Sequence, residues 1–231
     1  GAAGQGGFEI DQSLRFNDGD EAYLSKTFAS AGNRKTWTWS AWVKSATTAG
    51  ADYLFFAKSG NNDNEYGGIE LGEHLKINLY NESAATADLS LRDPSAWYHM
   101  MVVLDTTQAS NRIKMYINGT QASVTNNSSY PDQNEDLSIN NNCPHSISSR
   151  YAHSSSQYFD GYMAEMHFID GTALTPSSFG ETGDYGEWKP IEVSGLTYGT
   201  NGFYLSFAGG GIMSATGGNS TATDGSYKAA S

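Results

Sequence analysis

The chain has 231 residues, of which 26 are glycine and 13% are aromatic, while only 16% are charged. This balance favours short strands and many turns over long solvated helices, so we expect one all-β domain. The 25 acidic residues against 13 basic ones give a formal charge of −12. Because such a surface repels a phosphate backbone, nucleic acid is excluded as an expected partner.

The longest apolar run, Met100 to Leu104, is far shorter than the roughly 18 residues that a membrane span needs, so no membrane insertion is expected. A single cysteine, Cys143, excludes an intrachain disulfide. Composition divides the chain into a glycine-rich linker or processed end (residues 1–7), a patterned domain (8–208) and a Gly/Ser/Thr-rich tail (209–231).

The patterned domain begins with two short strands that flank a turn. Leu14 and Phe16 alternate with polar residues, Asn17 to Asp20 form a turn sequence, and Ala22 to Leu24 continue as an apolar strand, which predicts a hairpin. The acids of this turn are also the best local candidates for a Ca²⁺ site, since carboxylates are hard oxygen ligands. These candidates are Asp18, Asp20 and Glu21. The same residue types are what a turn requires in any case.

Two longer strands follow, and each has a distinct pattern. In the segment 36–44 one face carries Trp37, Trp39, Ala41 and Val43, and the other carries Thr38, Ser40, Trp42 and Lys44. Because both faces carry tryptophan, we expect one of them to enter the core and the opposite one to be covered by a loop or left as an aromatic patch. The segment 97–105 is apolar on both faces, which predicts a central strand, with His99 as a satisfied buried group.

The segment 112–117 alternates and runs into Asn118-Gly119, the strongest two-residue hairpin signal, with a returning strand over residues 120–124. We expect two polar loops after it, over residues 126–142 and 144–157. Loops on a rigid sandwich often carry recognition, because an aromatic ring stacks on a sugar and nearby polar groups bond its hydroxyls. The candidate ligand-binding residues in or beside loops are Asn61, Asp63, Tyr66, Tyr130, Tyr151 and Tyr158. Ordinary loop packing explains any one of these tyrosines better than ligand binding does, and it is the collection that favours a binding surface.

The segment 158–179 has the sequence YFDGYMAEMHFIDGTALTPSSF. It predicts a strand that begins after a glycine, a turn at Asp170-Gly171 and a following loop that contains a proline. This pattern is typical of the last strand of a β-sandwich. Together with SLRF, WTWSAWVK, WYHMMVVLD and RIKMYINGTQAS, in that order, it resembles the laminin-G-like, concanavalin-A-like jelly-roll family. The segments AGNRKTWTWSAWVK and FDGYMAEMHFIDG resemble the form of this domain found in structural proteins of marine bacteriophages.

The resemblance implies two packed antiparallel sheets of six or seven strands each, with rim loops that bind glycans or proteins and in some relatives hold calcium. The chain departs from the family's closing motif. Gly161-Tyr162-Met163 is followed by Ala164 where an acid is usual, and only Glu165 keeps its acidic character. This departure weakens the case for Ca²⁺, and no cofactor is required.

The sequence also lacks the usual catalytic patterns. Glycoside hydrolases of this fold carry paired acids as E-x-D-x-E on one strand, whereas Glu9-Ile10-Asp11 continues without the third acid, and Glu70 and Glu73 lack a middle one. There is no G-x-S-x-G elbow, and Cys143 with His145 and His153 does not complete a zinc set. We therefore expect no enzymatic activity.

The expected function is a noncatalytic module on a virion surface or extracellular appendage, such as a tail fibre, that adheres to host-surface glycans through its rim loops. A homo-oligomer that contacts other virion proteins is expected. Two alternatives stay open: a purely structural, self-assembling or decorating capsid or tail subunit, and a polysaccharide hydrolase.

Overall fold

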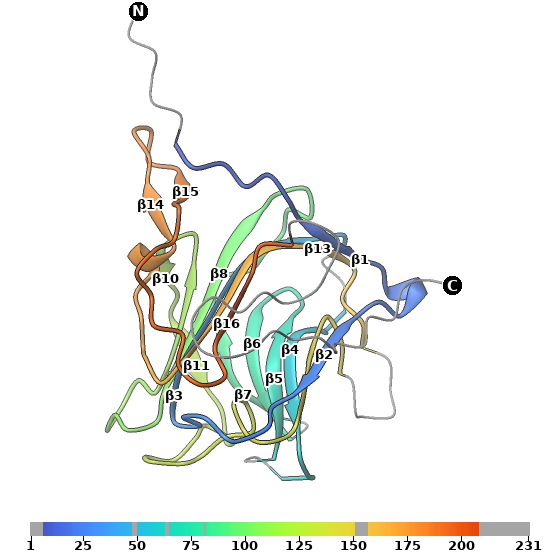
Figure 1. Ribbon diagram of the computed structural model, residues 1–231, viewed down its shortest axis with the longest axis vertical. Helices are drawn as coiled ribbons and strands as arrows, with labels where there is room; N and C mark the ends of the chain where they lie inside the picture. The colour runs from blue at the N-terminus through green and yellow to red at the C-terminus, as the bar shows by residue number, and fades with distance from the viewer. Residues whose placement is uncertain (1–6, 48–49, 63–64, 81, 151–156, 208–231) are drawn as a thin grey trace, which may run out of the picture.

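The computed structural model describes residues 7–47, 50–62, 65–80, 82–150 and 157–207. Two seven-stranded antiparallel sheets pack face to face around one main core (Figure 1). The helices within the described ranges are two three-residue 3₁₀ turns, η1 (Asp18–Asp20) and η2 (Pro176–Ser178). Neither is long enough to cross a membrane. The expected all-β sandwich is confirmed, whereas most of the two expected flexible ends lies outside the described residues.

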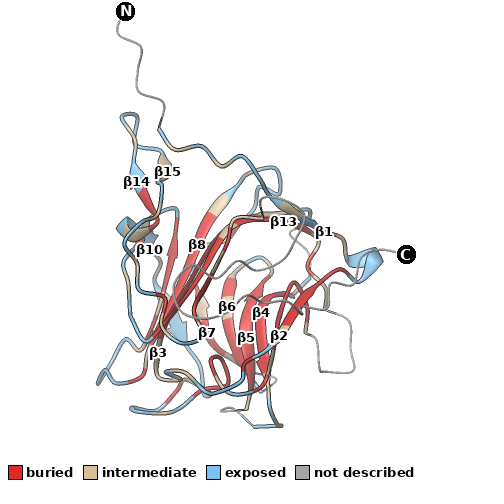
Figure 2. Cartoon of the chain, in the orientation of Figure 1, coloured by how far each residue is buried: buried red, intermediate tan, exposed pale blue. Residues whose placement is uncertain are grey.

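Sheet A runs in the order β1-β13-β3-β8-β9-β10, and β16 also pairs with β13. Its strands are β1 (Leu14–Phe16), β13 (Gly161–Asp170), β3 (Thr36–Ser45), β8 (Tyr98–Asp105), β9 (Ile113–Ile117), β10 (Thr120–Gln121) and β16 (Phe203–Leu205). The central place of β8 confirms the expectation from its two apolar faces. Figure 2 shows this part of the sheet as buried.

Sheet B runs in the order β11-β7-β6-β5-β4-β12-β2. Its strands are β11 (Val124–Asn126), β7 (Glu82–Ala87), β6 (Leu75–Leu79), β5 (Tyr66–Leu71), β4 (Asp52–Lys58), β12 (Pro144–Ile147) and β2 (Leu24–Thr27). A separate hairpin of β14 (Gly180–Thr182) and β15 (Trp188–Pro190) stands beside sheet A.

The core between the sheets is built by strand alternation. Trp37 and Trp39, which the two-residue period places on one face of β3, are almost fully buried, so this is the face that enters the core. Phe55 of sheet B meets Phe168 of sheet A with ring centroids 5.3 Å apart. Truncating such a buried aromatic ring to alanine costs about 3–5 kcal/mol, so these positions hold the two layers together.

A buried carboxylate fixes the loops at one end of the sandwich. Asp170, at the end of β13, accepts hydrogen bonds from the backbone amides of Asn33 (2.8 Å), Thr200 (3.1 Å) and Asn201 (3.1 Å) and from the Asn140 side chain (2.6 Å). A buried charge is tolerated when donors surround it in this way. Asp170 therefore tethers three loops that are far apart in sequence.

The predicted hairpin between residues 14 and 24 is wrong. β1 pairs with β13 in sheet A, whereas β2 pairs with β12 in sheet B, so the chain crosses from one layer to the other. The Asn17 side chain accepts from the Gly19 amide and starts η1. Glu21 then adopts a left-handed backbone (φ 54°) that turns the chain toward the second sheet.

The two segments expected as polar loops are largely built into the fold. Residues 144–147 form β12, which lies between β4 and β2 in sheet B, and Leu137 and Ile139 enter the main core. His145 is buried, with Nε2 accepting from the Asn140 amide at 2.9 Å. The polar sequence was misleading here because the buried side chains of Asn140, His145, Ser146 and Ser148 are satisfied by hydrogen bonds.

Two predicted turns are confirmed. Asn118 and Gly119 both have positive φ (49° and 77°) between β9 and β10, as a two-residue hairpin turn requires. Gly171, at φ 89°, follows β13, and η2 then begins at Pro176. A bulge interrupts β13 between Ala164 and His167.

Candidate ligand-binding cleft

Two segments of the chain cover the outer face of sheet A. Residues 171–202, which we call the C-terminal strap, include η2, β14 and β15 and cover one half. There they bury a second apolar cluster formed by Met101, Val103, Tyr116, Ile169, Phe179 and Tyr198. The segment 8–13, which precedes β1, passes over the other half (Figure 1).

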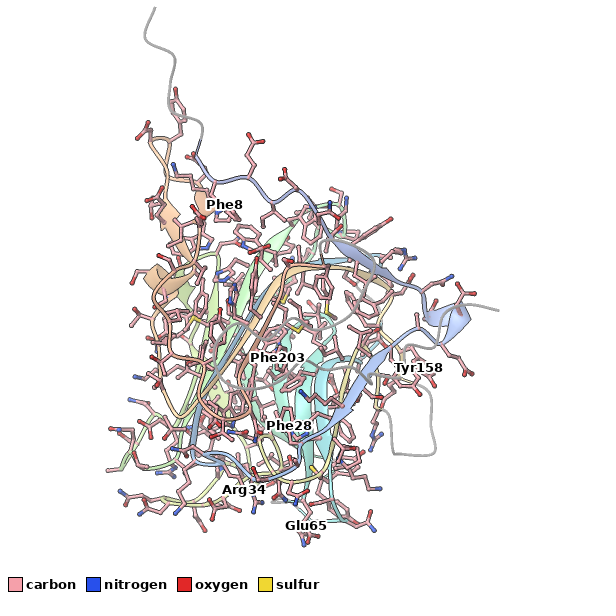
Figure 3. The ribbon with its side chains drawn as sticks, in the orientation of Figure 1. Phe8, Phe28, Arg34, Glu65, Tyr158 and Phe203 are labelled. Carbon is pink, nitrogen blue, oxygen red and sulfur yellow. The ribbon has the colours of Figure 1, made fainter. Side chains whose placement is uncertain are left out.

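An open cleft of about 600 Å³ lies between the segment 8–13 and β15. Its described lining consists of Phe8, Glu9, Ile10, Asp11, Gln12, Ser13, Trp42, Trp97, Ala164 and Pro190. Figure 3 shows Phe8 beside the β14–β15 hairpin. The volume falls within the range of about 300–1,000 Å³ typical of small-molecule sites.

The floor of the cleft is formed by Trp42 and Ala164, which are paired across β3 and β13. Trp42 projects from the outer face, opposite Trp37 and Trp39, and its ring centroid lies 5.3 Å from that of His99. Ala164 stands where the resembling family has an acid. Its small side chain leaves open space beside the indole instead of a carboxylate, so this departure from the motif helps to shape the cleft.

Trp97 forms an exposed aromatic edge of the cleft. Its side chain is 37% exposed, and its ring lies 6.3 Å from that of Tyr162, which is 38% exposed. The Arg15 guanidinium lies 5.2 Å from the centre of the Tyr162 ring and pairs with Asp160 at 2.6 Å. Trp97 and Tyr162 thus extend an aromatic surface beyond the floor at Trp42.

The wall opposite the indole rings is polar. It carries the exposed side chains of Glu9, Asp11 and Gln12. Within the described part of the chain, neither carboxylate makes a hydrogen bond or an ion pair, and no basic residue lines the cleft. The combination of aromatic faces with free carboxylate and amide oxygens can stack on a ring and accept hydrogen bonds from its substituents.

The outer face of sheet B carries another aromatic cluster, formed by Tyr53, Phe56 and Tyr66, but all three rings are buried. The Arg150 guanidinium lies 5.8 Å from the Tyr53 ring centre and 4.9 Å from that of Tyr66. The Lys58 ammonium lies 5.3 Å from the Tyr66 ring centre. The sequence-based expectation that Tyr66 stacks on a ligand is therefore wrong in this structure, because its ring already packs in the protein.

Beside this cluster lies a buried carboxyl group with polar partners. Glu70 accepts hydrogen bonds from Asn78 and, at 3.4 Å, from Lys76. Burial raises the pKa of Glu70, and burial followed by the nearby acids Asp18, Glu70 and Asp160 raises the pKa of Asp52 to about 6. Glu70 is therefore engaged by Asn78 and Lys76 and does not offer a free binding surface.

The remaining predicted ligand residues do not converge. Asn61 is exposed in the loop after β4, Tyr158 packs beside Tyr23 with ring centroids 6.2 Å apart, and the Tyr130 hydroxyl accepts from the Ile113 amide at 3.1 Å. Figure 3 shows Glu65, in the same loop as Asn61, well separated from Tyr158. Asp63 and Tyr151 lie outside the described residues. These residues stay predictions without a common site.

Tyr130 borders a smaller cleft of about 390 Å³ next to β11, and its ring lies 5.2 Å from the Arg112 guanidinium. Half of the ring packs against the main core. This cleft has no exposed large aromatic among its described lining residues, so it offers less for stacking than the cleft at Trp42.

The turn proposed for calcium serves a structural purpose. Asp18 accepts from the Gly19 amide at 2.7 Å, and Asp20 accepts from the Asn17 side chain at 2.5 Å. Across the described ranges no group of three or more His, Cys, Asp or Glu is placed to hold a metal ion. The geometry gives Asp18, Asp20 and Glu21 no shared coordination site.

His99 is a satisfied buried group, as expected. Its Nε2 lies 2.8 Å from the Ser40 hydroxyl, and its Nδ1 accepts from the Trp188 indole at 3.1 Å. Because an indole N–H can only donate, His99 is neutral with its proton on Nε2. Burial lowers the pKa of His99 to about 4 and that of His167 to about 3.

Sequence reasoning named Trp42 as a possible outward patch and Glu9 and Asp11 as an incomplete acid motif, but it did not join them. The signal available was the alternation in β3, which placed Trp42 opposite the core. Nothing local indicated that the segment 8–13 would lie above this ring.

The chain matches the family model described as the concanavalin A-like lectin/glucanases superfamily over residues 17–178. This match covers more than half of the chain, and the protein therefore belongs to that superfamily. A comparison with curated proteins gave no match.

Among solved structures, the chain is similar to a proposed carbohydrate-binding protein from Bacteroides ovatus, with 15% identity and a TM-score of 0.53. The match covers 74% of this chain and 46% of that one, so the chain spans less than half of its length. A sialidase CBM40 from Ruminococcus gnavus bound to α2,3 sialyllactose gives 10% identity and a TM-score of 0.49, covering 74% and 96% of the two chains. At these identities the likeness shows the fold alone.

Proposed function

We propose that this protein is a noncatalytic glycan-binding module and that the cleft at Trp42 and Trp97 holds the sugar. The observation that carries this proposal is the 600 Å³ cleft with an indole floor, an exposed indole edge and an unpaired polar wall. Sugar rings present an apolar face that stacks on indole and hydroxyls that donate to carboxylate and amide oxygens. Membership of a superfamily described by lectins and glucanases supports a carbohydrate ligand.

The arrangement of the acids favours binding over hydrolysis. Glycosidic cleavage uses two carboxyl groups on opposite sides of the scissile bond. Glu9 and Asp11 come from one extended segment and lie on one wall, and the described lining has no carboxylate opposite them. We expect no release of reducing ends from any glycan that binds, and release that disappears in Glu9→Gln or Asp11→Asn would support the hydrolase alternative.

The direct test replaces the exposed indole. Trp97→Ala should weaken glycan binding at least tenfold, since truncating an aromatic side chain that anchors an interface costs about 2 kcal/mol or more. Tyr80→Ala is the matched control, because Tyr80 has a similar exposed fraction (40%) but lies in the turn after β6 of sheet B. The measurement is calorimetry with the best ligand from a glycan array of correctly folded protein. Equal loss in both variants, or no loss in Trp97→Ala, contradicts the proposal.

We also propose that the module is displayed on a virion surface or appendage and adheres to host-surface glycans as part of an oligomer. The segments resembling marine phage structural proteins support this placement. Electron microscopy of purified particles labelled with an antibody against the module tests it. Particles without the label would contradict display, and a lattice in which Trp97 is buried between subunits would favour the purely structural alternative.

A further inference from the structure

The ionisable side chains that line the cleft carry charge of one sign, which is negative. Glu9 and Asp11 on the wall are the ionisable groups of the described lining, and both are exposed carboxylates without a hydrogen-bond or ion-pair partner in the described ranges. The other described lining residues are aromatic, aliphatic, amide or hydroxyl side chains. A ligand in this cleft therefore meets negative charge that no basic lining residue offsets.

Two basic residues near the cleft are paired with acidic residues. Lys189, next to the cleft residue Pro190, lies 3.2 Å from Glu181. Arg15 pairs with Asp160 and lies over the Tyr162 ring. Lys44 is two residues beyond Trp42 on the same face of β3, outside the lining and opposite Tyr162 in the register.

From this geometry we infer that the cleft selects glycans without acidic groups and favours sugars that carry a protonated amino group. The inference rests on the proposed glycan-binding function and names its ligand class. A carboxylate or sulfate placed near Glu9 and Asp11 is repelled, and the surrounding field of a chain with net charge −12 adds to this repulsion. A protonated amine in the same position is attracted and can donate to both carboxylates.

The experiment compares matched glycans on the intact protein. Chitosan oligosaccharides are set against chitin oligosaccharides of equal length, which differ in the free amine, and neutral agarose oligosaccharides against sulfated carrageenan oligosaccharides. We expect chitosan to bind roughly tenfold more tightly than chitin at low salt, and carrageenan more weakly than agarose. Both differences should shrink in 1 M salt, where charges are screened within about 3 Å.

The variant Glu9→Gln/Asp11→Asn keeps the shape of the wall and removes its charge. It should lose most of the preference for chitosan over chitin and gain binding of carrageenan relative to agarose. The matched control is Glu73→Gln/Asp184→Asn, which changes the net charge equally at exposed sites outside the cleft lining. It should keep the wild-type preference.

The outcomes separate the two proposals. If chitosan and carrageenan bind equally well, or if the two double variants behave alike, charge selection by the wall is wrong, although loss of binding in Trp97→Ala would still support the glycan site. If Lys44→Gln alone abolishes carrageenan binding, an acidic glycan is held by Lys44 and the inference is also wrong. If no glycan binds to the folded protein, the proposed function itself fails.

Discussion

At the scale of single residues, the exposed indole of Trp97 is placed by a short turn. Asp93 accepts from the Ser95 amide at 2.8 Å and from the Ser95 hydroxyl at 2.5 Å, and the Ala96 amide donates to the Asp93 carbonyl at 3.3 Å. The Ser95 hydrogen bonds are the main reason that the pKa of Asp93 is lowered. This turn holds the chain in position just before β8 begins.

We predict that Asp93→Ala weakens glycan binding about threefold to tenfold, because the ligand must then order a looser indole. Asp93→Asn should bind nearly as well as wild type, since its amide oxygen can still accept from Ser95. Titration calorimetry checks both affinities, and thermal melting checks that both variants fold. Identical affinity in the alanine variant would show that the turn does not preorganise Trp97.

At the scale of elements, the C-terminal strap depends on one close contact. The Trp188 indole donates to His99 and packs so near the β9–β10 turn that a Cβ added at Gly119 would lie 2.3 Å from Cε3 of the indole. The strap carries Pro190, which lines the cleft, so the position of β15 affects both the second apolar cluster and the cleft.

We predict that Gly119→Ala lowers the free energy of unfolding by about 3 kcal/mol, because a methyl group adds overpacking against Trp188 to the cost of a left-handed backbone. Gly186→Ala is the control. Gly186 has a similar φ (85°) with nothing within 4 Å of an added Cβ, so only about 1 kcal/mol of backbone strain is expected. Urea unfolding measures both values, and equal losses would show that the indole contact is unimportant.

At the scale of the whole molecule, buried histidines couple stability to pH. Burial lowers the pKa of His99 and His145 to about 4 and that of His167 to about 3. In the unfolded chain these groups take up protons near pH 6.5, so below that pH the unfolded state binds more protons and gains stability relative to the folded state. The raised pKa values of Asp52, Glu70 and Glu165 act in the opposite sense, and for Asp52, whose pKa is about 6, this effect falls between about pH 6 and 4.

We predict that the free energy of unfolding falls as pH drops from 6.5 toward 4, and that His167→Phe makes this fall shallower. Removing one histidine that resists protonation should reduce the slope by up to about 1.4 kcal/mol per pH unit. Urea unfolding of both proteins between pH 7.5 and 4.5 provides the slopes. A variant slope equal to that of wild type would mean that His167 does not contribute.

How far the sequence predicted this protein depends on the range of the interactions involved. The faces of β3, the central place of β8 and the Asn118-Gly119 turn followed from residues close together in the chain. The separation of β1 and β2 into different sheets did not, because the crossing depends on which distant strand each one pairs with. The strand 144–147 was missed because hydrogen bonds from distant segments offset the cost of burying its polar residues.

The sequence by itself determined the all-β class, the common strand face of Trp37 and Trp39, and the absence of an acid at Ala164, since each depends on local alternation or on one residue. Only the tertiary structure decided that Trp42, Trp97, Ala164 and the segment 8–13 share one cleft. These parts come from different regions of the chain and meet only because sheet A and its two covers pack together. A binding site assembled by long-range packing leaves no pattern within any single segment.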